Sequence, residues 1–126
     1  AQALRGGQVM MARILLKRVY EKPAKTDGLR ILVDRLWPRG LSKQKAKVDR
    51  WLRDIAPSAA LRKWYGHDPA RWLEFRRRYA KELKARPGAV TELRSLLKAH
   101  ANVTLLFSSK EEKLNNAVAL KAYLRK

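Results

Sequence analysis

The chain has 126 residues, of which 30 are Lys or Arg and 11 are Asp or Glu, so its formal net charge is +19. Its length suits one domain, and 46% hydrophobic residues are enough for a packed core and too many for a disordered basic tail. The lack of cysteine excludes disulfides, thiolate metal sites and a cysteine nucleophile, and two histidines are too few for a histidine-rich metal centre.

The N-terminal segment has neither a signal-peptide pattern nor a periodic one. Residues 1–10 begin AQALRGG, and we interpret them as a disordered leader or an expression remnant, with the native start at Met10 or Met11. Residues 11–126 are then expected to form a single domain. No apolar run approaches the roughly 20 residues that span a bilayer, so a soluble, cytoplasmic protein with no membrane contact is expected.

Two strands are predicted in the first third of the chain. Residues 13–20 (RILLKRVY) form the first, and residues 29–34 (LRILVD) form the second after a turn that ends in Asp-Gly. Pro38 and Gly40 interrupt regular structure, and Ser42 is expected to cap a short helix through Lys47. Residues 48–55 fit a helix, or a short strand around Val48 to Leu52, because their periodicity does not separate the two.

Helices dominate the rest of the chain. One begins at Pro57-Ser58 and ends at Gly66, and the next has Asp68 as its N-cap and stops at Pro87-Gly88. Its apolar stripe is Trp72, Phe75, Tyr79 and Leu83, and its favourable ion pairs are Glu74–Arg78 and Glu82–Arg86. A further helix, a buried strand and a last helix follow, at Val90/Leu93/Leu97, residues 102–107 (NVTLLF) and residues 111–124.

This alternation of strands and helices predicts an α/β fold. We expect a single domain with a small, largely parallel sheet flanked by helices in a Rossmann-like three-layer arrangement.

The segment of residues 34–43 (DRLWPRGLSK) is the first candidate site, because it follows a predicted strand and ligands of open α/β sheets bind beyond the carboxyl ends of strands. Arg35, Arg39 and Lys43 are the residues expected to bind an anion, with Trp37 as an apolar wall. The alternative is a rigid Trp-Pro corner that packs on the core and leaves its arginines in water.

A second candidate site surrounds His67, a possible acid–base group near neutral pH, with Asp34 or Glu82 to orient it. Ser58, Arg62 and Trp64 are expected to contact the same ligand. The alternative is a structural histidine in a turn between two helices. A hydrolase triad of Ser58 and His67 is not favoured, since no Gly-x-Ser-x-Gly elbow surrounds the serine.

Two weaker signals accompany these. The four tryptophans and Arg76-Arg77-Arg78 suit stacking and phosphate contacts, although a core tryptophan and a solvated arginine face are the simpler interpretation. Ser108-Ser109-Lys110 follows the NVTLLF strand and offers a generic anion-binding turn.

Five motifs follow one another along the chain: LVDRLWPRGLSK, WLxDIAPS, LRKWYGHDP, FxxRYxxEL and VTLLF. In this order they resemble the domain-of-unknown-function 488 family in its short bacterial form, and the resemblance covers about residues 13–124. The resemblance implies an α/β domain and a family with no assigned activity. Its short form has Asn-His-Ala where this chain has Asn115-Asn116-Ala117, so it implies that a histidine role is lost here. The residues that the motifs nominate are Arg35, Trp37, Pro38, Arg39, Gly40, Lys43, Trp51, Pro57, Ser58, Arg62, Trp64, His67, Tyr79 and Glu82.

Three functions remain open at this point, and no cofactor is expected for any of them. The first is a basic strand-end pocket that binds a small anionic, phosphate-bearing ligand. The second is a nucleic-acid-binding accessory protein that acts through its charge. The third is a partner-binding subunit, whose signature would be an exposed tryptophan patch. Whether the protein is an enzyme, and its oligomeric state, are left open.

Overall fold

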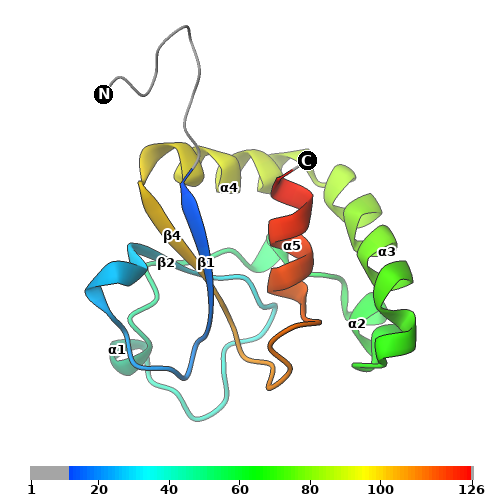
Figure 1. The fold of residues 1–126 in the computed structure, drawn as a ribbon, viewed down its shortest axis with the longest axis horizontal. Helices are drawn as coiled ribbons and strands as arrows, with labels where there is room; N and C mark the ends of the chain where they lie inside the picture. The colour runs from blue at the N-terminus through cyan, green and yellow to red at the C-terminus, as the bar shows by residue number, and fades with distance from the viewer. Residues whose placement is uncertain (1–11, 126) are drawn as a thin grey trace, which may run out of the picture.

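Four parallel strands form the centre of the fold (Figure 1). The computed structural model describes residues 12–125, so the predicted leader over residues 1–10 lies outside the described part. The spatial order of the strands is β1-β4-β2-β3. The last strand in sequence therefore lies between the first two, and it pairs with β1 along its whole length. The strands are β1 (Arg13–Arg18), β2 (Leu29–Leu32), β3 (Arg50–Trp51) and β4 (Asn102–Phe107).

Helices cover one face of this sheet densely. Alternate strand residues such as Ile14, Ile31 and Leu105 are buried against them and form the main core. The helix α4 also closes the end where β1 begins, since the Ala12 amide donates to the Leu97 carbonyl (Figure 1). The helices of this face are α2 (Ala59–Tyr65), α3 (Trp72–Lys84), α4 (Pro87–Ala99) and α5 (Asn116–Leu124).

The opposite face has a thinner cover. The short helix α1 (Lys43–Ala46) packs there through Ala46 on Leu32 and Leu106. The protein is thus a single α/β domain with a parallel sheet covered on both faces, as the sequence predicts. No helix within residues 12–125 is long and apolar enough to cross a membrane.

A buried ion cluster completes this second face. Asp27 and Arg30 are both 4% exposed, and their Oδ2 and Nη1 atoms lie 2.6 Å apart. Lys17 on β1 donates to the same carboxylate at 3.1 Å. Arg30 also donates to the carbonyls of Ala46 and Lys47 at the end of α1. The cluster therefore attaches α1 and the turn before β2 to the sheet.

The predicted helix ends are confirmed wherever a local hydrogen bond determines them. Ser42 and Ser58 accept from the amides of Lys45 and Leu61, and Asp68 accepts from Ala70, so all three residues are N-caps. Gly66 ends α2 in the left-handed conformation. Pro69 begins a 3₁₀ turn, Pro69–Arg71, that leads directly into α3.

The apolar stripe of α3 is confirmed as well. Phe75, Tyr79 and Leu83 are each 1% exposed, and Trp72 is half-buried against the Phe75 ring with centroids 5.8 Å apart. The Glu74–Arg78 ion pair forms, with Nε and Oε2 2.8 Å apart.

Of the two alternatives over residues 48–55, the short strand is confirmed: β3 (Arg50–Trp51) lies between Val48 and Leu52, and a 3₁₀ turn, Arg53–Ile55, follows it. Other sequence-based boundaries differ from the structure. The last helix begins at Asn116 and not at Glu111, since the Glu111 carboxylate caps a turn by accepting from Lys113 and Leu114. The strands β1 and β2 are each two residues shorter than predicted.

The predicted ion pair between Glu82 and Arg86 is wrong. The Arg86 guanidinium donates to the carbonyls of Asp54 and Ala56 at 3.0 and 2.8 Å, and Glu82 accepts from Ser58. Glu82 on α3 and Arg86 just beyond its end therefore both bind the segment before α2. The predicted pair required both residues to lie in one helix, but α3 ends at Lys84, so Arg86 is outside it and its guanidinium binds nearby backbone carbonyls.

Candidate functional site

A cleft lies at the carboxyl ends of β2 and β4, and we call it the strand-end cleft. It consists of two adjoining cavities that share Asp34, Arg62 and Ser108. The outer cavity, of about 480 Å³, is also lined by Arg18, Tyr20, Leu36, Trp37, Pro38, Arg39 and Lys110. The inner cavity, of about 200 Å³, is also lined by Tyr65, His67, Phe75, Ser109, Asn115 and Asn116.

Asp34 holds the floor of this cleft together. Its Oδ2 atom accepts from the Ser108 amide at 2.9 Å and from the Ser108 hydroxyl at 2.6 Å. Its Oδ1 atom accepts from the Asn116 side-chain amide at 3.0 Å. The Trp51 indole donates to the Asp34 carbonyl at 2.8 Å. One aspartate thus joins the ends of β2 and β4 to the start of α5.

Four cations surround the outer cavity. Arg18 is fixed, because its guanidinium donates to the carbonyls of Ser108 and Ser109 and lies 5.0 Å from the Tyr20 ring centroid. Arg39, Arg62 and Lys110 are exposed. Among the ion pairs of residues 12–125, none involves these three side chains. The cavity therefore combines an anchored guanidinium with three cations whose charge is not neutralised by a carboxylate.

The segment of residues 34–43 contributes two of its four predicted contact residues to the cleft. Trp37 and Arg39 line the outer cavity, whereas Arg35 and Lys43 are exposed and do not line it. Trp37 also packs on the core, with its indole donating to the Leu41 carbonyl at 2.6 Å and its ring 5.4 Å from that of Trp51. The rigid corner and the cavity wall are thus the same residue.

The residues predicted around His67 are similarly divided. Arg62 and His67 line the inner cavity, whereas Ser58 and Trp64 do not. The Ser58 hydroxyl donates to Glu82 at 2.5 Å and caps α2. The Trp64 ring lies under the Arg78 guanidinium, 4.1 Å from its centroid. Both side chains therefore have structural contacts elsewhere.

His67 lies in a strained turn at the inner cavity. Its φ angle is +58°, directly after Gly66 at +54°. No carboxylate of residues 12–125 hydrogen-bonds its ring: Asp34 is bound to Ser108 and Asn116, Glu82 to Ser58, and Asp68 to the Ala70 amide. The position of His67 in a turn between two helices fits a structural role for this histidine. Because the residue also lines the inner cavity, its ring can still contact a ligand there.

Replacing His67 by glycine is expected to stabilise the fold by about 0.5–1 kcal/mol. Glycine adopts a positive φ without the cost of roughly 1–2 kcal/mol that other residues incur, and its more flexible unfolded chain offsets part of the gain. Urea denaturation measures the change. His67→Ala is the matched control, because it removes the ring and keeps the strain. A His67→Gly variant less stable than His67→Ala would contradict the expectation.

Tyr65 closes the bottom of the inner cavity. Burial, with Glu111 and Asp68 nearby, raises the pKa of its phenol above the ordinary value. The hydroxyl therefore stays protonated and donates to the Leu114 carbonyl at 2.8 Å. Its ring stacks on Phe75 with centroids 4.3 Å apart, so this wall is rigid.

Three further site residues were not singled out from the sequence. Arg18 lies within an apolar strand, and only its position at the carboxyl end of β1 would have indicated a site. Asn116 was noted only as a departure from the family motif, and Asp34 only as a partner of His67. The turn Ser108-Ser109-Lys110, a weak signal in the sequence, lies in the cleft with all three residues.

The tryptophans do not form an exposed patch. Trp37, Trp51, Trp64 and Trp72 are all half-buried, so the signature expected for a partner-binding subunit is not found in the described part of the chain. The large hydrophobic side chains that are exposed there are Tyr20, Leu36 and Leu73. Residues 12–125 also contain no group of three or more Asp, Glu, His or Cys side chains placed to hold a metal ion.

The single α/β domain with its four-stranded parallel sheet defines the class of this protein, and the strand-end cleft lies at the carboxyl ends of its strands. Within that class the chain belongs to the DUF488 family: the model described as the inactive DUF488-N3 subclade matches residues 13–126. The resemblance in the sequence motifs is therefore confirmed.

Two bacterial proteins are similar to this chain over most of its length. The chain is similar to the uncharacterized protein YeaO of Escherichia coli K12, with 39% identity over 112 residues, which are 89% of this chain and 96% of the relative. It is also similar to the uncharacterized protein Rv3073c of Mycobacterium tuberculosis H37Rv, with 47% identity over 88 residues, 70% of this chain and 74% of the relative. No solved structure gives a significant match.

Proposed function

We propose that this protein binds a small anionic, phosphate-bearing ligand in the strand-end cleft. The observation that carries the proposal is the set of cations around one cavity, Arg39, Arg62 and Lys110 without ion pairs and Arg18 fixed beside them. Guanidinium groups bind phosphate through paired, charge-assisted hydrogen bonds. A ligand phosphate would supply the partner that these side chains lack.

The walls of the outer cavity favour a ligand with a planar or apolar part as well. Tyr20 and Leu36 are 42% and 68% exposed at its rim, and Trp37 lies beside them. Ligand sites typically combine apolar walls with a few polar groups that orient the ligand. The volume of about 480 Å³ lies within the range of small-molecule sites, roughly 300–1,000 Å³.

The family match supports ligand binding without a chemical reaction. The matching family model describes its subclade as inactive. Asn116, which stands where the short form of the family has a histidine, donates its amide to Asp34 in the inner cavity. An amide cannot exchange a proton near neutral pH as an imidazole can, so Asn116 cannot serve as the acid–base group that a histidine would provide at this position.

Calorimetric titration with inorganic pyrophosphate at low salt tests the proposal. Arg39→Ala and Arg62→Ala are each expected to weaken binding about tenfold or more, because a charge-assisted hydrogen bond contributes about 1.5–3 kcal/mol. Arg35→Ala is the matched control: it removes the same charge from the same loop, at a residue outside the cleft. It is expected to change the affinity less than threefold, as a long-range charge effect.

Two results would overturn this function. Equal losses in Arg35→Ala and Arg39→Ala would show that only the general field of the protein attracts the anion. No heat of binding for wild-type protein with inorganic pyrophosphate would show that the cations do not converge on a phosphate.

A further inference from the structure

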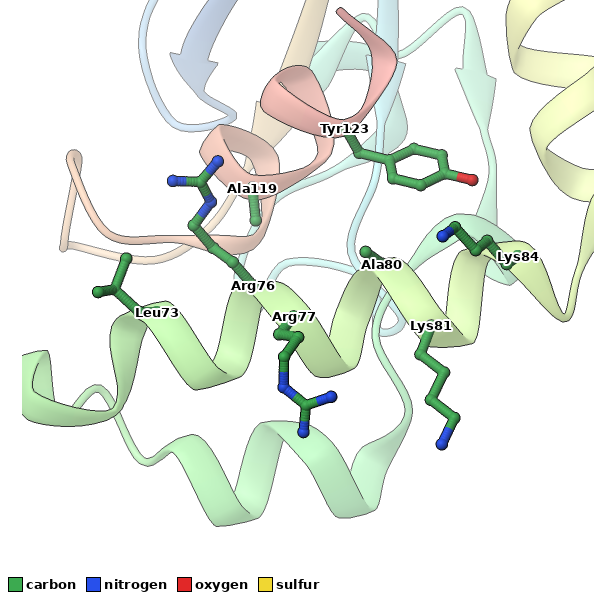
Figure 2. Close-up of a pocket in the computed structure, with 8 residues that line it drawn as sticks. All are labelled: Leu73, Arg76, Arg77, Ala80, Lys81, Lys84, Ala119 and Tyr123. Atoms are coloured by element: carbon green, nitrogen blue, oxygen red, sulfur yellow. The ribbon is translucent and has the colours of Figure 1, made fainter. Parts of the chain in front are cut away.

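A second basic surface lies between α3 and α5, and we call it the α3–α5 groove. It has a volume of about 520 Å³ and shares no lining residue with the strand-end cleft. Ala80 of α3 and Ala119 of α5 line its floor, and their small side chains leave the space open (Figure 2). The function proposed above does not use this groove.

The charge of the groove is entirely positive. Arg76, Arg77, Lys81 and Lys84 line it, and no acidic residue does. Glu74 neutralises Arg77, with Nη2 and Oε2 2.6 Å apart. The other three cations form no ion pair with a described residue. Figure 2 shows Arg76 at the α5 side of α3 and Lys84 near the Tyr123 ring, at two ends of the floor.

Large apolar side chains in the groove are few, and they lie at opposite ends of it. Leu73 is 74% exposed at one end, and Tyr123 is half-buried at the other (Figure 2). A helical peptide partner would need a continuous row of apolar pockets at helical spacing. A single nucleic-acid strand needs instead a row of cations along its backbone and an aromatic ring on which a base can stack. The groove provides this second combination.

We infer that the α3–α5 groove binds the backbone of a single-stranded nucleic acid, with Arg76 and Lys84 on phosphates and the Tyr123 ring against a base; Arg77 and Lys81 point away from α5 and add to the positive charge beside the groove (Figure 2). The net charge of +19 attracts such a polymer to the whole protein by counterion release. The groove then orients the strand. A DNA or an RNA strand presents the same phosphate and base chemistry to these residues.

The test is fluorescence anisotropy with labelled single-stranded DNA and RNA of about 12 nucleotides, within the range that one small binding domain covers. Arg76→Ala with Lys84→Ala is expected to weaken binding at least tenfold. It should also lower the slope of log affinity against log salt by about 1.4, since each phosphate contact on a single strand contributes about 0.7. Lys45→Ala with Lys98→Ala is the matched control, which removes two exposed charges from α1 and α4.

Tyr123→Leu separates stacking from charge. It keeps an apolar side chain against the core, and it is expected to weaken oligonucleotide binding several-fold while leaving retention on heparin, a polyanion without bases, unchanged. Circular dichroism confirms that each variant is folded.

Three outcomes would overturn the inference. Equal losses of affinity in the groove double variant and in the control double variant would show that binding depends on net charge alone. Unchanged oligonucleotide affinity in Tyr123→Leu would remove the stacking contact. Displacement of the oligonucleotide by a polyglutamate peptide at equal charge concentration would assign the groove to an acidic protein partner. Wild-type affinity for pyrophosphate in the groove variants would show that the strand-end cleft is unaffected.

Discussion

Replacing Asp27 by asparagine is expected to lower the free energy of unfolding by about 3 kcal/mol. The carboxylate is 4% exposed and accepts from Arg30, Lys17 and the Ala24 amide. An asparagine of the same shape leaves the buried Arg30 guanidinium without a counter-charge, and breaking a buried ion pair from one side costs about 3–5 kcal/mol. Urea denaturation of the variant measures the loss.

Asp54→Asn is the matched control for this variant. Asp54 is exposed, and its carboxylate forms no ion pair within residues 12–125. Its replacement is expected to change stability by less than about 0.5 kcal/mol. A loss of similar size in both variants would show that the buried cluster contributes no more than a surface carboxylate.

The same cluster predicts how stability depends on pH. Burial raises the pKa of Asp27, and the hydrogen bonds from Ala24, Lys17 and Arg30 outweigh it, so the pKa is held below the ordinary value of 3.8. The stabilisation is therefore fully present above that ordinary value and is lost as the pH falls through the lower value of the folded state. Wild-type protein should lose stability more steeply below about pH 4 than Asp27→Asn does.

Replacing Gly28 by alanine is expected to cost more than about 3 kcal/mol or to prevent folding. A Cβ atom on Gly28 would lie 2.1 Å from the Asn102 carbonyl oxygen, which belongs to the backbone of β4 and cannot move aside. The backbone of Gly28 also has φ +65° and ψ −139°, a region that is essentially restricted to glycine. Clash and strain both act at the point where β2 begins to pair with β4.

Two other glycines separate these contributions. Gly40 has φ +75° and open space around its Cβ position, so Gly40→Ala carries the backbone strain alone, roughly 1–2 kcal/mol. Gly88 lies in α4 with open space, so Gly88→Ala is expected to be neutral or stabilising by up to about 1 kcal/mol. If Gly28→Ala costs no more than Gly40→Ala in thermal or urea denaturation, the close approach to Asn102 is not rigid.

Elements defined by local interactions could be predicted from the sequence. The caps at Ser42, Ser58 and Asp68 and the strand at Asn102–Phe107 agree with the structure. In each case the signal and the structure involve neighbouring residues: a hydroxyl or carboxylate and an amide two or three residues later, or an apolar run bounded by polar residues. The predicted start of the last helix at Glu111 was wrong, because a carboxylate that accepts from nearby amides can cap a simple turn as well as a helix.

The candidate site was predictable in its place and only partly in its members. Arg35 and Arg39 lie in one loop, four residues apart, and only Arg39 lines the cleft. In a helix or strand, spacing determines the direction of a side chain. In the irregular segment around Pro38 and Gly40 it does not, because each residue has its own backbone conformation. Arg18 and Arg62 reach the same cavity from β1 and α2, far apart in the sequence.

By itself, the sequence determined that this basic chain forms one α/β domain with a parallel sheet, that it belongs to its family, and that its polar loops lie beyond the strand ends. Composition and periodicity are enough for the fold class, because they report which surfaces must be buried, whereas the family follows from the resemblance of the sequence motifs. Only the tertiary structure decided the strand order, the buried ion cluster, and which of the 30 Lys and Arg residues gather in the strand-end cleft and the α3–α5 groove. Those features depend on contacts between segments that are distant in the sequence. A local sequence pattern does not show which other residue a charged side chain will lie beside.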